Sequence, residues 1–292
     1  MGERSMSQAS NCQQGILDGV PEHGRYLWFQ LEKDRVEHAK AQLEILLNNV
    51  DGQNTVVGLG KVALELLNKS VDGFDEFPAY DQHGIQVPST PAALWVWLRG
   101  DDPGKLLHSS RSLITLLTPG FTLSHSVDGF KFDGGKDLSG YEDGTENPEG
   151  DDAVNAAFSS EGASFVAVQQ WQHNLLHFES LPQQEKDHII GRRQSDNEEL
   201  DDAPVSAHVK RTAQESFEPE AFMLRRSMPW AEGQNSGLVF VCFANSTSPF
   251  KQQMARMAGE EDGITDGLFR FSQPKNGAFF WVPPMNNGKI QL

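Results

Sequence analysis

Apolar and polar positions follow one another along this chain in two patterns, a short apolar run and a helical periodicity. Residues 26–31 form a run rich in aromatic and aliphatic side chains, which is typical of a β-strand. After a polar stretch, apolar residues return at helical spacing, which predicts an amphipathic helix: Val36, Ala39, Leu43, Leu46 and Val50. Residues 94–98 and a leucine-rich helix after the polar turn at 101–104 repeat the same order.

The order of elements recurs in the second part of the chain. Residues 165–168 predict a strand, and the following helix is expected to begin at Ser180, with Gln183 three residues later in a capping-box pattern. Gly191 takes the usual glycine position after that helix. Residues 238–241 predict another strand, and a polar turn at 245–249 leads from it into a methionine-containing helix.

Strand, turn and helix at matching places indicate a duplicated β-α-β unit with helices on one face of a sheet. We therefore predict an α+β fold with two similar halves, residues 1–155 and 156–292. Residues 120–162 are rich in glycine and aspartate and are expected to form a long loop. Loops of this length in compact domains are usually functional or disordered, and the motif within this one favours function.

That motif is the stretch 140–148, which surrounds a single carboxylate, Asp143. Gly140 and Gly144 permit backbone angles and close approaches that a side chain would block. Asn147 and Pro148 then impose a turn or an extended exit. A loop built in this way holds Asp143 in a fixed place, although an acidic surface turn would use the same residue types.

Four motifs in order resemble those of the dye-decolorizing peroxidases, a haem enzyme family whose hallmark is G-x-x-D-G. They lie at residues 136–148, at 190–201, at 206–209 and at 224–230. The chain is most similar to the cytoplasmic, compact subgroup often called type B. The resemblance implies two ferredoxin-like halves whose antiparallel sheets pack together with helices outside, and haem held in the C-terminal half.

The resemblance also implies roles for individual residues. His208 matches the proximal ligand of the iron of haem b, and Asp266 matches the carboxylate that orients such a histidine. Asp143 and Arg225 match the acid–base pair on the peroxide side. Arg192 matches the arginine that binds a haem propionate, with the neighbouring Arg193 as the alternative.

Three further positions are expected around the haem. Ser227 stands where some relatives have asparagine, so manganese oxidation does not carry over from them to this chain. Leu238 and Phe240 alternate on one face of a strand and are expected to form an apolar wall, or ordinary core. Arg226 should point away from Arg225 if this segment is extended, as a surface charge.

The activity implied is a haem-dependent peroxidase. It would reduce H₂O₂ through a ferryl intermediate and oxidise small or bulky aromatic donors, such as phenols and dyes, in one-electron steps. Tyr141, beside the catalytic loop, is the favoured electron relay, with Trp171 and Trp230 as alternatives. Two other functions stay open: a non-catalytic haem-binding or haem-handling protein, and a related enzyme that degrades chlorite.

Composition narrows the choice of partners. The formal net charge of −17 disfavours nucleic acid and anionic membranes as partners. Cys12 and Cys242 lack the spacing of a metal site or a disulfide framework, and no signal peptide is apparent, so we expect a cytoplasmic protein. The resemblance implies a homo-oligomer, dimeric or larger.

A zinc site would draw on His173 and His177, which are four residues apart. Asn174 replaces the glutamate of a zinc motif, and residues 165–171 before it are predicted to form a strand and not a helix, so zinc is not expected.

Overall fold

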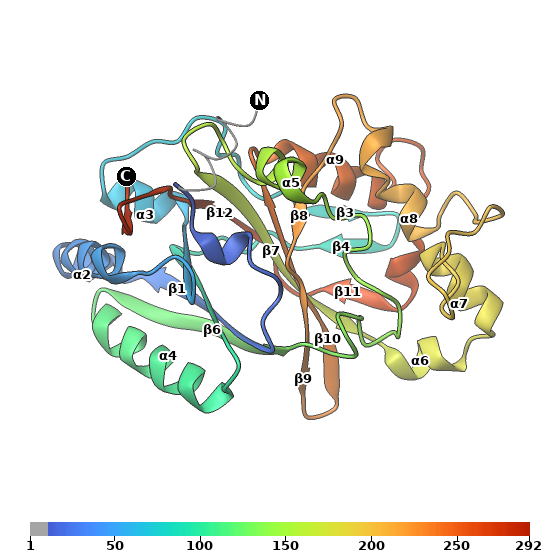
Figure 1. The fold of residues 1–292 in the computed structure, drawn as a ribbon, viewed down its shortest axis with the longest axis horizontal. Helices are drawn as coiled ribbons and strands as arrows, with labels where there is room; N and C mark the ends of the chain where they lie inside the picture. The colour runs from blue at the N-terminus through green and yellow to red at the C-terminus, as the bar shows by residue number, and fades with distance from the viewer. Residues whose placement is uncertain (1–10) are drawn as a thin grey trace.

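Four strands from the first part of the chain form one antiparallel set (Figure 1). The structure is a computed structural model that describes residues 11–292. The spatial order is β2-β5-β1-β6, formed by β1 (His23–Leu31), β2 (Thr55–Leu59), β5 (Leu94–Gly100) and β6 (Phe121–Phe130). Helices α2 (Val36–Asn49) and α4 (Pro103–Leu117) connect these strands and cover one face of the sheet.

A second antiparallel set, in the order β12-β7-β10-β9, forms the C-terminal part. Its strands are β7 (Ser164–His173), β9 (Met228–Glu232), β10 (Asn235–Ala244) and β12 (Ala278–Val282). Two short strands extend it, with β8 (Leu224–Arg225) on β10 and β11 (Ser272–Pro274) on β7. Single register pairs, Gly129 with Trp230 and Leu59 with Trp281, join the two sets into one ten-stranded system.

Shorter elements surround the second set. They are α5 (Gly150–Ala157), α6 (Leu175–Ser180), α7 (Gln183–Ile190), α8 (His208–Arg211), α9 (Ser248–Met257), η3 (Gln214–Ser216) and η4 (Gly267–Arg270). The first part adds η1 (Gln14–Ile16), η2 (Lys33–Arg35), α3 (Lys61–Leu66) and the hairpin β3 (Tyr80–Gln82) to β4 (Ile85–Val87). The strands β13 (Met285–Asn286) and β14 (Lys289–Ile290) form a last hairpin. No helix within residues 11–292 is long and apolar enough to cross a lipid bilayer.

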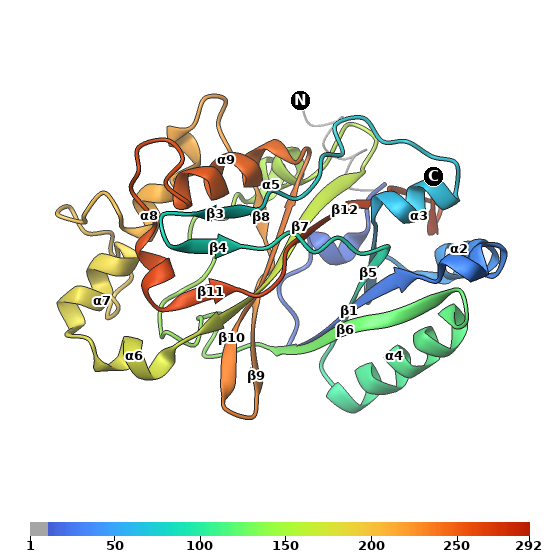
Figure 2. The same cartoon turned by 180° about the vertical axis from the view of Figure 1, so that it is seen from behind.

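The core lies in layers on both faces of the strands. Side chains of both sets, among them Trp95, Val166, Val239 and Phe280, pack together in one buried cluster. The outer face of the first set packs against α2 and α4, and that of the second packs against α9. Figure 2 shows the β3–β4 hairpin of the N-terminal part lying beside β11, and its apolar side chains belong to the same cluster as those of α9.

The predicted helices and strands are largely confirmed, and their local causes are visible. In α2, the buried residues Ala39, Leu43 and Leu46 follow the predicted spacing, so one stripe of the helix faces the sheet. The N-terminus of α4 is capped by Asp102, whose carboxylate accepts hydrogen bonds from two backbone N–H groups, and Pro103 occupies the first turn. These two features end the preceding strand and start the helix.

Two predictions were wrong. Ser180 does not begin a helix: it ends α6, its hydroxyl donates to the carbonyl of His177, and α7 starts only at Gln183 after Pro182. The proline restricts its own backbone and starts a new helix, which the capping pattern did not take into account. Residues 120–162 are not one loop, because β6 and α5 lie within them. Irregular structure is largely confined to residues 131–149, which contain Asp143.

Candidate active site

One cavity of about 410 Å³ brings together most of the predicted site residues. Such a volume lies in the range typical of ligand and cofactor sites, roughly 300–1,000 Å³. The loop around Asp143, strands β7 and β10, and helices α8 and α9 all contribute side chains to it. Much of its lining is apolar, with Ile190, Val209, Leu238, Phe240, Phe250, Met254, Met257 and Leu268. The cavity therefore suits a large apolar ligand that also carries a few polar groups.

His208 is the first residue of α8, and its side chain lines this cavity. Its Nδ1 lies 2.8 Å from an oxygen of Asp266, whose side chain is fully buried. The other oxygen of Asp266 accepts the backbone N–H of Leu268 at 2.8 Å and caps η4. In the neutral tautomer whose Nδ1–H donates to Asp266, Nε2 of His208 keeps a lone pair for a ligand. Asp266 is thus no helix-surface acid, which was the alternative to its expected role.

Asp143 and Arg225 form an ion pair at the same cavity. The carboxylate lies 3.6 Å from the guanidinium, and each side chain is about one fifth exposed, at 20% and 21%. Asp143 comes from the irregular loop and Arg225 from the two-residue strand β8. A carboxylate can accept or return a proton, and a permanently charged guanidinium can stabilise negative charge beside it.

The structure explains why glycine occupies positions 140 and 144 of the loop. Both have positive φ angles, +87° for Gly140 and +82° for Gly144. A Cβ atom on Gly140 would lie 2.5 Å from the side-chain amide of Gln194, and one on Gly144 would lie 2.7 Å from that of Asn147. The positive φ angles favour glycine at both positions, and a Cβ atom would also displace the ends of the Gln194 and Asn147 side chains.

Arg192, and not Arg193, lies at the cavity. Its guanidinium forms an ion pair with Glu146 and lies 3.8 Å from Glu199, and it donates to the carbonyl of Asn197 at 2.9 Å. Arg193 instead pairs with Asp196, and its side chain is half exposed. Arg192 is thus one of three Lys or Arg side chains at the cavity, with Lys210 and Arg225.

The remaining predicted residues divide into two groups. Leu238 and Phe240 line the cavity, opposite Trp171 and Gln169 in the β7–β10 register. Ser227 is not among the residues that line it, and its hydroxyl lies 3.4 Å from the backbone N–H of Val241. Arg226 points elsewhere, as expected, but it is partly buried and not a surface charge, and burial lowers its pKa to about 10.

A second polar cluster at the cavity was missed in the sequence. The imidazole of His173 lies between the hydroxyl of Ser272, at 2.6 Å, and the carboxylate of Asp137, at 3.0 Å. All three residues line the cavity. His173 ends β7 whereas His177 lies on α6, so the two histidines do not share one helix face. Residues 11–292 contain no group of three or more histidine, cysteine or acidic residues that could hold a metal ion.

We expect Asp137→Asn to destabilise the protein by about 1–3 kcal/mol at neutral pH, the usual cost of disturbing a buried hydrogen-bonded pair. Burial raises the pKa of Asp137, but hydrogen bonds from His173 and Ser139 outweigh it and lower the pKa overall. This stabilisation is present above the pKa of the unfolded aspartate, roughly 3.9, and is lost as pH falls through the lower folded pKa. Urea unfolding of both proteins at pH 7 and near pH 3 measures it, and a difference that does not shrink in acid would contradict it.

Comparison with known proteins places this geometry in context. The profile of the family described as "Dyp-type peroxidase, C-terminal" matches residues 135–287, more than half of the chain. A dye-decolorizing peroxidase of Mycobacterium tuberculosis is 29% identical over 212 residues, which are 68% of this chain and 63% of that protein. One from Rhodococcus erythropolis is 28% identical over 246 residues, 80% of this chain and 72% of that protein.

Solved structures show the same fold. A dye-decolorizing protein from Vibrio cholerae superposes with a TM-score of 0.81 at 25% identity, over 92% of this chain and 96% of that one. A DypB variant from Rhodococcus jostii, solved in complex with haem, superposes with a TM-score of 0.79 at 24% identity, over 90% of this chain and 93% of that one. The agreement extends beyond the region that the family profile matches.

Proposed function

Because this chain belongs to the Dyp-type peroxidase family, we propose that it is a haem peroxidase that reduces H₂O₂ and oxidises aromatic donors in one-electron steps. One observation carries the proposal. A histidine backed by a buried carboxylate, His208 with Asp266, and an acid–base pair, Asp143 with Arg225, serve one largely apolar cavity. The first pair suits a metal cofactor and the second suits proton transfer to peroxide.

The donor set fits haem b. His208 would hold the iron through Nε2, because Nδ1 contacts Asp266. Leu238 and Phe240 supply apolar walls for the macrocycle, and Arg192 supplies a cation for a propionate. Glu146 and Glu199 now occupy that guanidinium, so binding of a propionate would replace carboxylate partners by another carboxylate. Ser227, which the sequence placed at the cofactor, would act only through the backbone of β10.

Two residues of the chain would move the peroxide proton and stabilise the charge that develops. Bound haem would supply the redox chemistry, which is two electrons for the peroxide that aromatic donors replace one at a time. The Asp143 carboxylate would take the proton from one peroxide oxygen and return it to the other, which becomes water. The Arg225 guanidinium, 3.6 Å away, would stabilise negative charge on the departing oxygen.

The proposal includes the finer architecture. Two ferredoxin-like halves, residues 1–155 and 156–292, are supported by the equivalent strand orders β2-β5-β1-β6 and β12-β7-β10-β9. Haem in the C-terminal half is supported by the origin of His208 and Arg192. Neither Cys12 nor Cys242 forms a disulfide, which suits the proposed cytoplasmic location. A homo-oligomer is proposed from family membership alone, and light scattering of the purified protein tests it.

Spectroscopy of the haem-loaded protein tests the function. A peroxidase should show a Soret band that changes on addition of H₂O₂ and returns when an aromatic dye is oxidised. A haem carrier should bind haem yet lose it to bleaching by peroxide without dye turnover. Chlorite in place of peroxide should release no oxygen. Absence of dye oxidation in a protein fully loaded with haem would overturn the proposal.

Tyr141 is the electron relay that we propose for donors too large for the cavity. It is not a surface residue: only 4% of it is exposed, although it lines the cavity on one side. Its hydroxyl donates to the carboxylate of Asp187, and the exposed Gln183 covers both, donating to them at 3.2 and 2.8 Å. Burial and this hydrogen bond raise the pKa of Tyr141, so the phenol stays protonated until oxidation.

The carboxylate of Asp187 makes Tyr141 easier to oxidise than the fully buried Tyr26. When Tyr141 gives up an electron, its phenolic proton would pass to Asp187 along the existing hydrogen bond. Tyr26 is fully buried, and its hydroxyl has no hydrogen-bond partner among the described residues, so its proton has no acceptor. The relay therefore depends on the pair and not on the aromatic ring alone.

We expect Tyr141→Phe to slow oxidation of a bulky dye about tenfold or more while the reaction with peroxide keeps its rate. The substitution preserves the ring packing against Phe178 and removes only the O–H group that is oxidised. Stopped-flow absorbance reads the two steps separately, and Tyr80→Phe is the matched control. A slower peroxide step in Tyr141→Phe would instead show that Tyr141 supports the Asp143 loop.

A further inference from the structure

The position of the Arg225 guanidinium depends mainly on the position of its own backbone, because few side-chain contacts hold it. Apart from the 3.6 Å ion pair with Asp143, its guanidinium has no hydrogen bond or ion pair with another described residue. Strand β8 that carries it has only two residues and lies at the end of the strand order. A strand this short, at an edge, gives little support of its own. Whatever holds the backbone of Arg225 therefore also sets its distance from Asp143.

One edge of that backbone faces away from β10. Arg225 is paired with Cys242, and the N–H of the next residue, Arg226, donates to the carbonyl of Val241 at 2.8 Å. In an antiparallel ladder, hydrogen-bonded and non-hydrogen-bonded pairs alternate, so Arg225 belongs to a non-hydrogen-bonded pair. Its own N–H and C=O thus need partners on the other side.

The side chain of Asn147 supplies both partners. Its Oδ1 accepts the N–H of Arg225 at 2.7 Å, and its Nδ2 donates to the C=O of Arg225 at 3.1 Å. Asn147 belongs to the loop of Asp143, and its own N–H donates to the carbonyl of Gly144 at 3.0 Å. The absence of a Cβ on Gly144 leaves room for this amide. One side chain thereby connects the two members of the acid–base pair.

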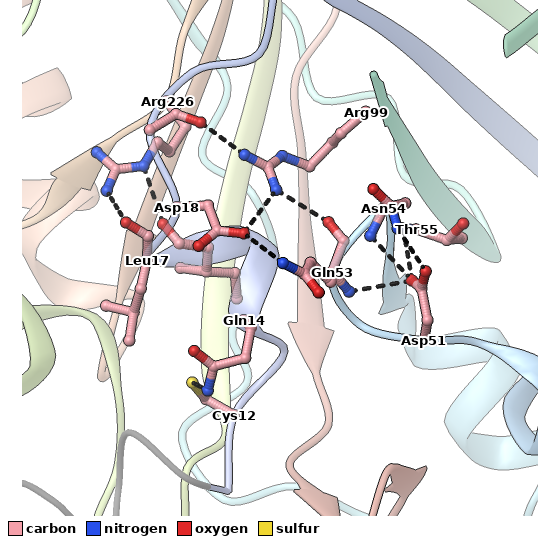
Figure 3. Close-up of polar contacts among 12 residues, drawn as sticks. Cys12, Gln14, Leu17, Asp18, Asp51, Gln53, Asn54, Thr55, Arg99 and Arg226 are labelled. Atoms are coloured by element: carbon pink, nitrogen blue, oxygen red, sulfur yellow. Dashed lines mark hydrogen bonds and ion pairs between the residues drawn. The ribbon is translucent and has the colours of Figure 1, made fainter. Parts of the chain in front are cut away.

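Arg226 holds the same carbonyl from another direction. Its Nη1 donates to the C=O of Arg225 at 3.1 Å. Its Nε and Nη2 donate to the carbonyls of Ile16 and Leu17, both at 2.9 Å, and Figure 3 shows Arg226 beside Leu17. Arg99, from β5, donates to the carbonyls of Gly19, at 2.6 Å, and Gln53, at 2.9 Å. The segment 16–19 is therefore bound by arginines from both parts of the fold, and only Arg226 also contacts Arg225.

We propose that Asn147 and Arg226 are positioning residues that hold the main chain of Arg225, and through it the guanidinium, at its working distance from Asp143. The proposal rests on the proposed function, because Arg225 needs this placement only if it acts on an anion or peroxide in the cavity. Asn147 is the more direct of the two, since it contacts both polar groups of the Arg225 peptide. Neither residue lines the cavity.

Hydrogen exchange of the haem-free protein tests the main-chain part. In Asn147→Ala, the backbone amide of Arg225 loses its acceptor and should exchange at least tenfold faster than in the wild type. Asn245→Ala is the matched control, because Asn245 is exposed and its side-chain amide donates to the carbonyl of Asn155, away from Arg225. Unchanged exchange at Arg225 in a folded Asn147→Ala protein would overturn the proposal whether or not haem binds.

Fluoride binding to the haem-loaded protein tests the side-chain part. Fluoride is an anion that ligates ferric iron and accepts a hydrogen bond from a neighbouring cation, so its affinity reports the placement of Arg225. We expect Asn147→Ala and Arg226→Gln to weaken fluoride about fivefold to tenfold, as for the loss of one or two hydrogen bonds. Arg99→Gln should lower stability and leave fluoride affinity unchanged. An equal loss in Arg99→Gln would show general destabilisation and overturn the assignment of Arg226.

Arg225→Ala separates this proposal from the proposed function. If Arg225→Ala weakens fluoride and Asn147→Ala does not, Asn147 is not a positioning residue. If Arg225→Ala leaves fluoride binding unchanged, the proposed role of Arg225 at the cofactor fails, and hydrogen exchange alone decides whether Asn147 holds the strand. Asn147→Asp gives a further check, because it keeps the acceptor for the Arg225 N–H but loses the donor to its C=O. Its exchange rate at Arg225 should lie nearer to that of the wild type than the rate in Asn147→Ala.

Discussion

Replacing His208 by alanine should abolish axial binding of haem iron by the protein. Within residues 206–210 the only other nitrogen-bearing side chain is Lys210, and a lysine ammonium has no lone pair for iron. The apolar walls at Leu238 and Phe240 and the cation Arg192 would remain, so some haem should still enter the cavity loosely. The visible spectrum and the haem content after gel filtration measure the result.

Two controls make this expectation sharp. His177→Ala removes a histidine on α6 that is exposed and does not line the cavity, and it should keep the wild-type spectrum. Imidazole added to His208→Ala should occupy the emptied position and restore the axial spectrum, because Asp266 stays in place to accept its N–H. Full haem retention with an unchanged spectrum in His208→Ala would exclude His208 as the ligand.

Much of the fold was predictable because its signals are local. The spacing of Ala39, Leu43 and Leu46 specifies the buried stripe of α2 whatever lies beneath it. Asp102 and Pro103 mark the start of α4 through their own hydrogen bonding and backbone restriction. The Ser180 prediction failed because a serine can end a helix as readily as it can begin one. Here its hydroxyl donates to the carbonyl of His177, one turn earlier in the helix.

The site was predictable only in part, because spacing along the chain says little about contacts across the fold. Asp143 stood out because glycines flank it, and His208 and Arg225 because their motifs resemble those of a known family. The contact of Asp137 with His173 joins residues 36 positions apart, and that of Asn147 with Arg225 joins residues 78 apart. The sequence placed Asn147 in a turn, which was a sufficient reason for an asparagine before a proline, and so concealed its second role.

The burial of Arg226 shows a related limit. Arg226 was expected at the surface because alternation along a strand directs it away from the side of Arg225. The alternation is present, but the direction away from the cavity leads to the segment 16–19 and not to solvent. Which face of a strand is exposed to solvent depends on what packs against it. Here the segment 16–19, more than 200 residues earlier in the chain, covers the face of Arg226.

Asp143→Ala and Arg225→Ala should each keep haem and slow the reaction with peroxide by about 10²- to 10⁴-fold, the usual effect of losing a positioned acid–base group or an electrostatic clamp. The two side chains lie 3.6 Å apart and serve the same peroxide, so their effects should not add. The double variant should be about as slow as the slower single variant. Stopped-flow absorbance after mixing with H₂O₂ follows this step without any donor.

The exposed pair of Arg193 and Asp196 provides the matched control, since it is also an arginine–aspartate ion pair but does not line the cavity. Alanine at either position should leave the peroxide step unchanged. Asp143→Asn distinguishes chemistry from shape, because it keeps the size of the side chain and removes its ability to take a proton. If Asp143→Asn reacts at the wild-type rate while Arg225→Ala is slow, charge stabilisation by Arg225 carries the reaction, and the proton must leave the peroxide by another route.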